Sequence, residues 1–238
     1  MQNFYKKNEL FFALIWIAVY VLSISAADGL SEEIGILKVI TLPVALVLSL
    51  LQYGWIRKNK LQQYYGLRRI TSIDFRKYLY FLPLLVLSTA NFWNGAVFEH
   101  SFLETALFIA SMLFIGFLEE VIFRGFLFKA LSRKSIRSAT LISSVTFGMG
   151  HIVNLLNGAD FLPTLLQIGY ASAIGFLFTV LFIKTKSLWP GILAHAFINA
   201  TSLFAVEGNG SVQLVSSLVM VFISVGYALY LSRLVPEN

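Results

Sequence analysis

Two adjacent carboxylates and an arginine lie in the middle of a strongly apolar stretch of this sequence. Residues 112–129 read MLFIGFLEEVIFRGFLFK, and the three charged side chains before the final lysine are Glu119, Glu120 and Arg124. Charged groups are costly in hydrocarbon, so ionisable residues in such a stretch mark a functional site by default. At helical spacing Glu120 and Arg124 share one face and can form an ion pair, whereas Glu119 lies about 100° further round and needs another partner.

Three more polar side chains interrupt apolar stretches further along the chain. They are His151, His195 and Asn199. At about 1.5 Å per residue, Glu119, His151 and His195 lie roughly 15, 18 to 20 and 11 Å from the membrane face that carries the basic loops. One layer of the membrane can therefore hold all of these groups.

If these polar groups lie close together, each of them can find a hydrogen-bond or charge partner among the others. Glu120 and Arg124 then have a supporting role, and Glu119 is free to meet His151. His195 and Asn199 share a helix face and can hydrogen-bond one ligand or each other. A single histidine or asparagine in a membrane helix equally suits helix–helix hydrogen bonding, so only the combination favours a functional site.

Small and hydroxyl residues near these groups are explained more simply by packing. Gly148, Gly150, Gly169 and Gly175 let membrane helices approach closely, and Ser143, Ser144 and Thr146 are typical of residues that bond the helix backbone. A serine nucleophile is not indicated, because the sequence has no G-x-S-x-G context.

The composition places these residues in a membrane protein. The 238 residues are 58% hydrophobic and only 13% charged, with 22 Phe and 10 Tyr, which is too apolar for a soluble domain. The net charge of +6 does not indicate nucleic-acid binding, since the basic residues form short clusters between apolar stretches. The chain has no cysteine, which excludes disulfides and thiolate chemistry and fits a bacterial membrane protein.

The apolar stretches predict an all-α bundle of about eight transmembrane helices. Each stretch has the length that a hydrocarbon core of about 30 Å requires. We expect one integral-membrane domain over residues 1–238. The predicted spans are 10–27, 36–56, 78–98, 103–128, 139–156, 161–183, 188–206 and 212–232.

The distribution of basic residues predicts the orientation of these spans. Eight spans place 16 of the 18 lysines and arginines on the side that also holds both termini, and Lys38 and Arg124 are the exceptions. Cytoplasmic loops carry an excess of such residues. Both termini should therefore be cytoplasmic, in a multi-pass protein of the cell membrane.

The polar groups form three short motifs, which resemble those of a known family. Glu119-Glu120-Val121-Ile122-Phe123-Arg124, Phe147-Gly148-Met149-Gly150-His151 and His195-Ala196-Phe197-Ile198-Asn199 are similar to the E-E-x-x-x-R, F-x-x-x-H and H-x-x-x-N motifs of the CPBP intramembrane proteases. This family comprises CAAX-protease and bacteriocin-processing (Abi-type) proteins. The order and spacing also match, and the resemblance covers a motif-bearing core of residues 100–205.

The resemblance implies an all-helical membrane protease with a cavity open to the cytoplasmic half of the membrane. Glu119 and His151 would activate water, His195 and Asn199 would bind the carbonyl oxygen or its oxyanion, and Glu120 and Arg124 would hold the site. The substrate would be a membrane-associated peptide, such as a bacteriocin leader or a pheromone. A sensor kinase or a secretion protein is a further partner that the resemblance suggests.

The residues leave two chemical schemes open. In one, Glu119 is a general base in a low-dielectric site and no cofactor is required. In the other, Glu119, His151 and His195 bind Zn²⁺ with water as the fourth ligand, as in a metalloprotease. We favour the metal-independent scheme.

Two other classes of function also fit an intramembrane Glu/His cluster. One is a non-proteolytic regulator or bacteriocin-immunity protein on the same fold. The other is an ion-coupled transporter, which would show inverted repeats and broken helices in matching halves. We find neither feature in the sequence, so we place the transporter below the other classes.

Overall fold

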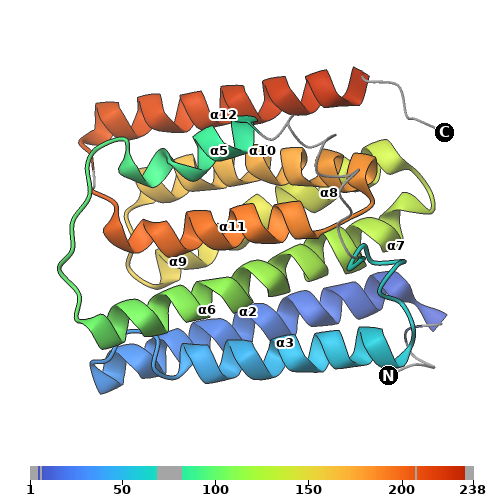
Figure 1. The fold of residues 1–238 in the computed structure, drawn as a ribbon, viewed down its shortest axis with the longest axis horizontal. Coiled ribbons are helices and arrows are strands. Elements are labelled where there is room, and N and C mark those ends of the chain that lie inside the picture. Colours follow the sequence, from blue (N-terminus) through green and yellow to red (C-terminus); the bar gives the residue numbers. More distant parts are fainter. Residues whose placement is uncertain (1–4, 6, 69–81, 207, 234–238) are drawn as a thin grey trace.

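The computed structural model is a bundle of helices that run roughly parallel or antiparallel to one another (Figure 1). It describes residues 5, 7–68, 82–206 and 208–233. These residues contain no β-strand, and only an isolated antiparallel bridge joins Ala96 and Ala205. The predicted all-α membrane bundle is therefore confirmed.

Five helical segments among the described residues are long and apolar enough to cross a membrane. The protein is thus a multi-pass integral membrane protein. The five segments are α2 (Glu9–Ile34), α6 with its extensions η3 and α7 (Phe102–Ser132), α8 to α9 (Ile136–Leu156), α10 (Phe161–Thr185) and α12 (Gly210–Arg233).

The other three predicted spans correspond to shorter helices. The second is α3 (Thr41–Lys58) and the seventh is α11 (Trp189–Thr201), which has 13 residues. The third is represented by α5 (Leu82–Ser88), and residues 78–81 of that span lie outside the described residues. The count of eight and the cytoplasmic placement of both termini stay predictions.

Local capping explains where several helices begin. Asn8 accepts a hydrogen bond from the backbone N–H of Phe11 at the start of α2, and Ser135 caps α8 (Ile136–Met149) in the same way. Ser101 and Glu104 form a reciprocal capping box at the start of α6 (Phe102–Glu120). At its other end α2 stops at Gly35, whose φ of 77° lies in the left-handed region that favours glycine.

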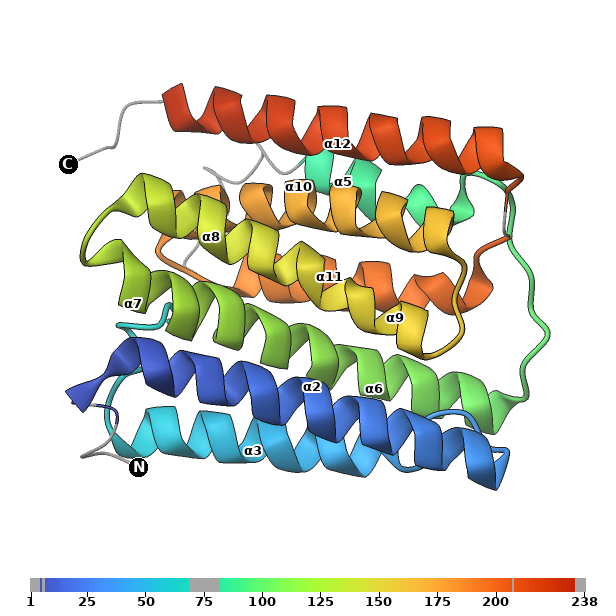
Figure 2. The same cartoon turned by 180° about the vertical axis from the view of Figure 1, so that it is seen from behind.

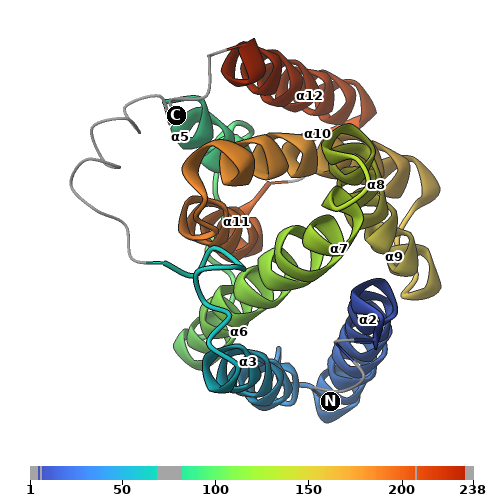
Figure 3. The same ribbon diagram turned by 90° about the vertical axis from the view of Figure 1, so that its right-hand side faces the viewer.

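The segment formed by α6, η3 (Val121–Leu127) and α7 (Phe128–Ser132) lies at the centre of the bundle (Figures 1 and 2). On one side it packs against α3, and η3 packs against α2. On the other side α6 packs against α11, while α8 packs against α10 and α10 against α12. Figure 3 shows α2 and α3 beside one flank of this central segment and α10 to α12 beyond the other.

Small residues allow α8 and α10 to pack closely at two of the four predicted positions, Gly148 and Gly175. A Cβ on Gly148 would lie 2.0 Å from Ser172 Oγ and 2.6 Å from the carbonyl oxygen of Ile168, so α10 approaches the backbone of α8 there. At Gly150 and Gly169 a Cβ would meet nothing within 4 Å. Close helix approach is therefore confirmed for Gly148, whereas the prediction is wrong for Gly150 and Gly169.

The hydroxyl groups of α8 bond the backbone, as the sequence predicts. Ser144 Oγ donates to the carbonyl of Thr140 within the helix, and Ser143 Oγ donates across to the carbonyl of Phe123 in η3 at 2.8 Å. Because η3 is π-helical, its carbonyls leave the α-helical ladder, and Ser143 supplies a donor to one of them.

An aromatic cluster fills the end of the bundle where α2 begins and η3 leads into α7. Phe12 and Trp16 of α2 lie with ring centroids 5.2 and 6.2 Å from that of Phe126. Trp55 and Tyr65 also contact Phe126, at 6.0 and 5.0 Å. We call Phe12, Trp16, Trp55, Tyr65 and Phe126 the aromatic cluster, and the end that holds it the basic end, because the predicted basic loops lie there.

Candidate functional site

A π-helical segment follows the two glutamates directly. Glu119 and Glu120 are the last residues of α6, and η3 carries Arg124. All seven residues of η3 are buried. Single π-helical turns inside α-helices often occur at functional sites, and here the turn joins the two carboxylates to the arginine.

Glu120 and Arg124 form a fully buried ion pair. Arg124 Nη1 lies 3.0 Å from Glu120 Oε1, and the side chains are 0% and 1% exposed. The guanidinium also stacks on the ring of Phe147, with its Cζ 4.2 Å from the ring centroid. The predicted ion pair is confirmed, and the aromatic face adds a cation–π contact to it.

His195 of α11 bridges the two glutamates. Its Nδ1 lies 3.1 Å from Glu120 Oε1, and its Nε2 lies 3.0 Å from Glu119 Oε2. The two ring nitrogens can donate hydrogen bonds at the same time only in the imidazolium form. The two carboxylates and the arginine are therefore linked through one buried histidine, which places the group from α11 beside that from α6.

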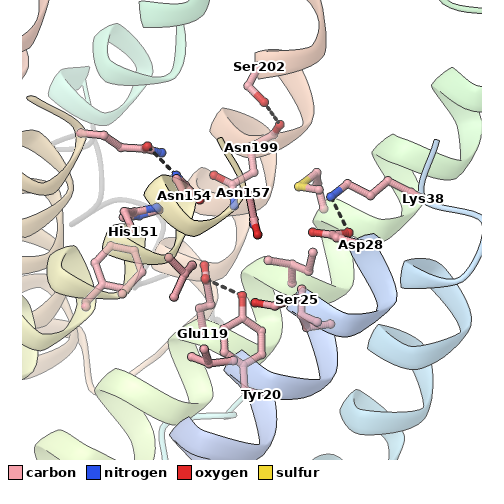
Figure 4. A pocket seen from close by; sticks show the side chains of 18 of the residues that line it. Tyr20, Ser25, Asp28, Lys38, Glu119, His151, Asn154, Asn157, Asn199 and Ser202 are labelled. Atoms are coloured by element: carbon pink, nitrogen blue, oxygen red, sulfur yellow. Dashed lines mark hydrogen bonds and ion pairs between the residues drawn. The ribbon is translucent and has the colours of Figure 1, made fainter. Parts of the chain in front are cut away.

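A tyrosine from the N-terminal helix completes the surroundings of Glu119. Tyr20 of α2 donates its hydroxyl to Glu119 Oε1 at 2.6 Å, across 99 positions of sequence (Figure 4). Sequence reasoning missed this residue, since a tyrosine in an apolar span is most simply packing. The one signal available was that Glu119 needed a partner that its own helix could not supply.

Glu119 faces a cavity of about 320 Å³. His151, in the 3₁₀ turn η4 (Gly150–Ile152) between α8 and α9 (Val153–Leu156), and Asn199 of α11 line the same cavity. The polar residues that line it are Tyr20, Ser25, Asp28, Lys38, Glu119, His151, Asn154, Asn157, Gln167, Asn199 and Ser202.

The close partners of Glu119 differ from the predicted one. Among the described residues its carboxylate meets Tyr20 and His195, whereas the ring of His151 packs edge-on against Phe147 with centroids 5.7 Å apart. His151 and Glu119 thus share a cavity without a direct hydrogen bond. His151 lies in the 3₁₀ turn that follows the end of α8 at Met149.

Two glycines make room for the buried ion pair. A Cβ on Gly175 would lie 2.7 Å from Arg124 Nη2 and 3.0 Å from Phe147 Cδ1, and a Cβ on Gly191 would lie 2.9 Å from Glu120 Oε2. The predicted close approach of helices also holds at Gly175, because its Cβ would lie 3.4 Å from the backbone carbonyl oxygen of Ser144 in α8. The guanidinium and the ring that stacks on it fill the rest of the space at Gly175.

Gly175→Ala is therefore expected to destabilise the protein, because the added methyl group displaces Arg124 from its stacked position. Overpacking of this kind costs about 1–3 kcal/mol. Gly169→Ala, on the same helix and with open space around the new methyl, is the matched control. The measurement is the free energy of unfolding in mixed micelles, and equal stability of the two variants would refute the steric role of Gly175.

The described residues do not fit the predicted zinc site. They contain no group of three histidine, aspartate or glutamate side chains placed to hold one metal ion. Both ring nitrogens of His195 face carboxylates, so neither is directed at a shared metal position with Glu119 and His151. We derive no step through a metal from this geometry.

Taken together, the fold and the site define a class of protein: a multi-pass helical membrane protein whose spans hold a buried Glu/Arg/His cluster beside a polar cavity. A family model described as "Type II CAAX prenyl endopeptidase Rce1-like" matches residues 101–201. Residues 101–201 are therefore similar to this family of CPBP-type membrane proteases, as the three motifs predict.

One curated relative also matches the chain. It is the Bacillus subtilis (strain 168) protein named "Putative membrane peptidase YdiL", which is 39% identical over 94 residues. The match covers 39% of this chain and 34% of the relative, so the chain spans about a third of the curated relative's length. No solved structure matches.

Proposed function

We propose that the protein is an intramembrane endopeptidase that hydrolyses a peptide bond through a water molecule activated by Glu119. The observation that carries this proposal is the placement of Glu119. Its side chain is 12% exposed, its carboxylate contacts Tyr20 and His195, and it lines a cavity large enough for a segment of peptide.

Glu119 retains the capacity to act as a base. An ionised carboxylate has about four lone-pair sites. In Glu119, Tyr20 occupies one site on Oε1 and His195 contacts Oε2. A water in the cavity can use a remaining site. Glu119 takes a proton as the water oxygen attacks the carbonyl carbon, and it returns the proton to the leaving nitrogen as the C–N bond breaks. The products are a carboxylic acid and an amine.

Two side chains of the cavity wall can stabilise the oxyanion. His151 and Asn199 both line the cavity with Glu119, and each can direct an N–H donor at an oxygen in it. We therefore assign the oxyanion role to this pair. The resemblance implied His195 and Asn199 instead, but the ring nitrogens of His195 face the two glutamates.

His195, Glu120 and Arg124 are positioning residues in this scheme. Arg124 holds Glu120, Glu120 faces Nδ1 of His195, and His195 orients Glu119 through Nε2. The chain of contacts fixes the carboxylate relative to the cavity, which is what a general base requires.

Hydrolysis in ¹⁸O-labelled water tests the proposal. The purified protein in lipid nanodiscs is incubated with a mixture of quenched-fluorescence decapeptides, and mass spectrometry reads the new carboxyl termini. We expect cleavage with one ¹⁸O at each new terminus, and we expect it to persist in a strict chelator. Loss of cleavage in the chelator with recovery on adding zinc would overturn the metal-independent scheme. No cleavage of any peptide by folded protein would count against the protease itself.

The natural substrate is to be found in cells. Peptides that accumulate uncut when Glu119→Ala replaces the wild-type protein identify the substrate, and a bacteriocin leader or pheromone is the class we propose. If Glu119→Gln kept full cellular function, a non-proteolytic regulator or immunity protein would be the better description. A sensor-kinase or secretion partner stays a prediction that the described contacts do not test.

Tyr20→Phe is expected to lower kcat by about 10- to 100-fold and leave KM unchanged, since a hydrogen bond to a charged group is worth about 1.5–3 kcal/mol. The phenylalanine ring keeps the packing of α2, so the stability should change little. Tyr53→Phe, on the exposed face of α3, is the control. If Tyr20→Phe lowered the free energy of unfolding and left the kcat of the folded protein unchanged, Tyr20 would have only a packing role.

A further inference from the structure

The cavity is closed at the basic end of the bundle. Phe123 and Phe147, which line it, are 3% and 4% exposed and meet edge-to-face with centroids 5.3 Å apart. Behind them η3 is buried throughout, and the aromatic cluster fills the space between α2, α3 and η3. The described residues therefore leave no path to Glu119 from the basic end.

The cavity reaches the surface at the opposite end, where α2 ends and α6 begins. Asn157, just after α9, and Ser202, just after α11, line the cavity and are exposed. Asp28 and Lys38 line it as well and form an ion pair at 2.8 Å (Figure 4). We call this end the mouth. The resemblance implied an opening on the side of the basic loops, which is the other end.

The wall between Glu119 and the mouth has two chemically different faces. One side carries four amide side chains. Asn154 donates a hydrogen bond to Gln167 at 2.8 Å, and Asn157 and Asn199 also line the cavity. On the other side α2 and α6 contribute apolar side chains, namely Ile24, Phe108, Met112 and Ile115.

Such a wall matches the chemistry of a peptide backbone. Each amide side chain has donors and an acceptor, as each peptide unit does, and neither carries a net charge. In an extended segment alternate side chains point to opposite faces, so apolar ones can lie against α2 and α6 while the backbone bonds the amides. A free anion or cation would find only a neutralised ion pair here.

We propose that this outer part of the cavity is the binding subsite for an extended peptide segment that enters through the mouth. The inference rests on the proposed peptidase function. From Tyr20 to Asp28 is eight residues of helix, about 12 Å, which an extended peptide spans with about four residues. If the basic loops are cytoplasmic, the substrate is a peptide presented from the non-cytoplasmic side.

Single cysteines test the direction of access without any substrate. The natural chain has no cysteine, so each variant reports one position. Ser25→Cys lies inside the cavity, Asn157→Cys at the mouth and Lys134→Cys at the basic end. Intact cells and inside-out vesicles are treated with a small, charged, membrane-impermeant methanethiosulfonate.

We expect Ser25→Cys to react from the same side as Asn157→Cys and from the side opposite to Lys134→Cys. Reaction of Ser25→Cys only from the side of Lys134→Cys would overturn the proposal. Its failure to react from either side would overturn it too, because the cavity would then be closed to water. Neither outcome depends on proteolysis.

A kinetic comparison tests the subsite itself. With the most rapidly cleaved quenched-fluorescence decapeptide, Asn157→Leu is expected to raise KM about five- to tenfold and leave kcat unchanged, because a peptide hydrogen bond is lost in the bound state. Leu156→Asn, at the neighbouring exposed position outside the cavity lining, is the control. An unchanged KM in Asn157→Leu would refute the subsite while leaving the hydrolysis result intact.

Discussion

Glu119→Gln should lower kcat by about 10²- to 10⁴-fold, the range that general acid–base catalysis supplies, while the protein remains folded. Glutamine has nearly the same shape, and its carbonyl oxygen can still accept the hydrogen bond from Tyr20. It cannot take a proton from water at neutral pH. The expected loss is therefore in the chemical step and not in the binding of peptide.

The measurement is kcat and KM with the decapeptide substrate, together with the unfolding transition of the variant. Glu99→Gln is the control, since Glu99 is exposed in the loop before α6 and lies outside the cavity lining. A Glu119→Gln protein that hydrolyses peptides at the wild-type rate would exclude Glu119 as the base.

Arg124→Met is expected to give the largest loss of stability of the substitutions considered. Removing one partner of a buried ion pair leaves the other charge unpaired and costs about 3–5 kcal/mol. Arg124 and Glu120 are 0% and 1% exposed, so water cannot replace the lost guanidinium. His195 beside Glu120 compensates only in part, because it also faces Glu119.

A double-mutant cycle separates the pair from the packing around it. Glu120→Gln combined with Arg124→Met removes both charges, and we expect the double variant to be more stable than Arg124→Met alone. The free energy of unfolding in mixed micelles is the measurement. If the two single losses simply added in the double variant, the ion pair would have no coupling energy and the structural role of Glu120 would be wrong.

The features that depend on local sequence could be predicted well. The apolar stretches indicated a multi-pass helical bundle, since backbone groups in hydrocarbon must bond within their own segment. The spacing of Glu120 and Arg124 predicted their ion pair, because i and i+4 positions meet on any helix. The pair persists although η3 is π-helical. Convergence of α6 and α11 was also expected, since ionisable groups in a membrane need partners.

Only the tertiary structure determined which residues on separate helices are in contact, because no rule of sequence spacing relates residues on different helices. Tyr20 reaches Glu119 from 99 positions away, His195 faces both glutamates at once, and His151 lies in the wall of the same cavity without a direct hydrogen bond to Glu119. The open end of the cavity also depends on how α2 packs, because its aromatic residues fill one end and leave the other free. Composition and local periodicity determine which residues must be shielded from lipid, but the relative placement of separate helices determines which partners they contact and at which end the cavity opens.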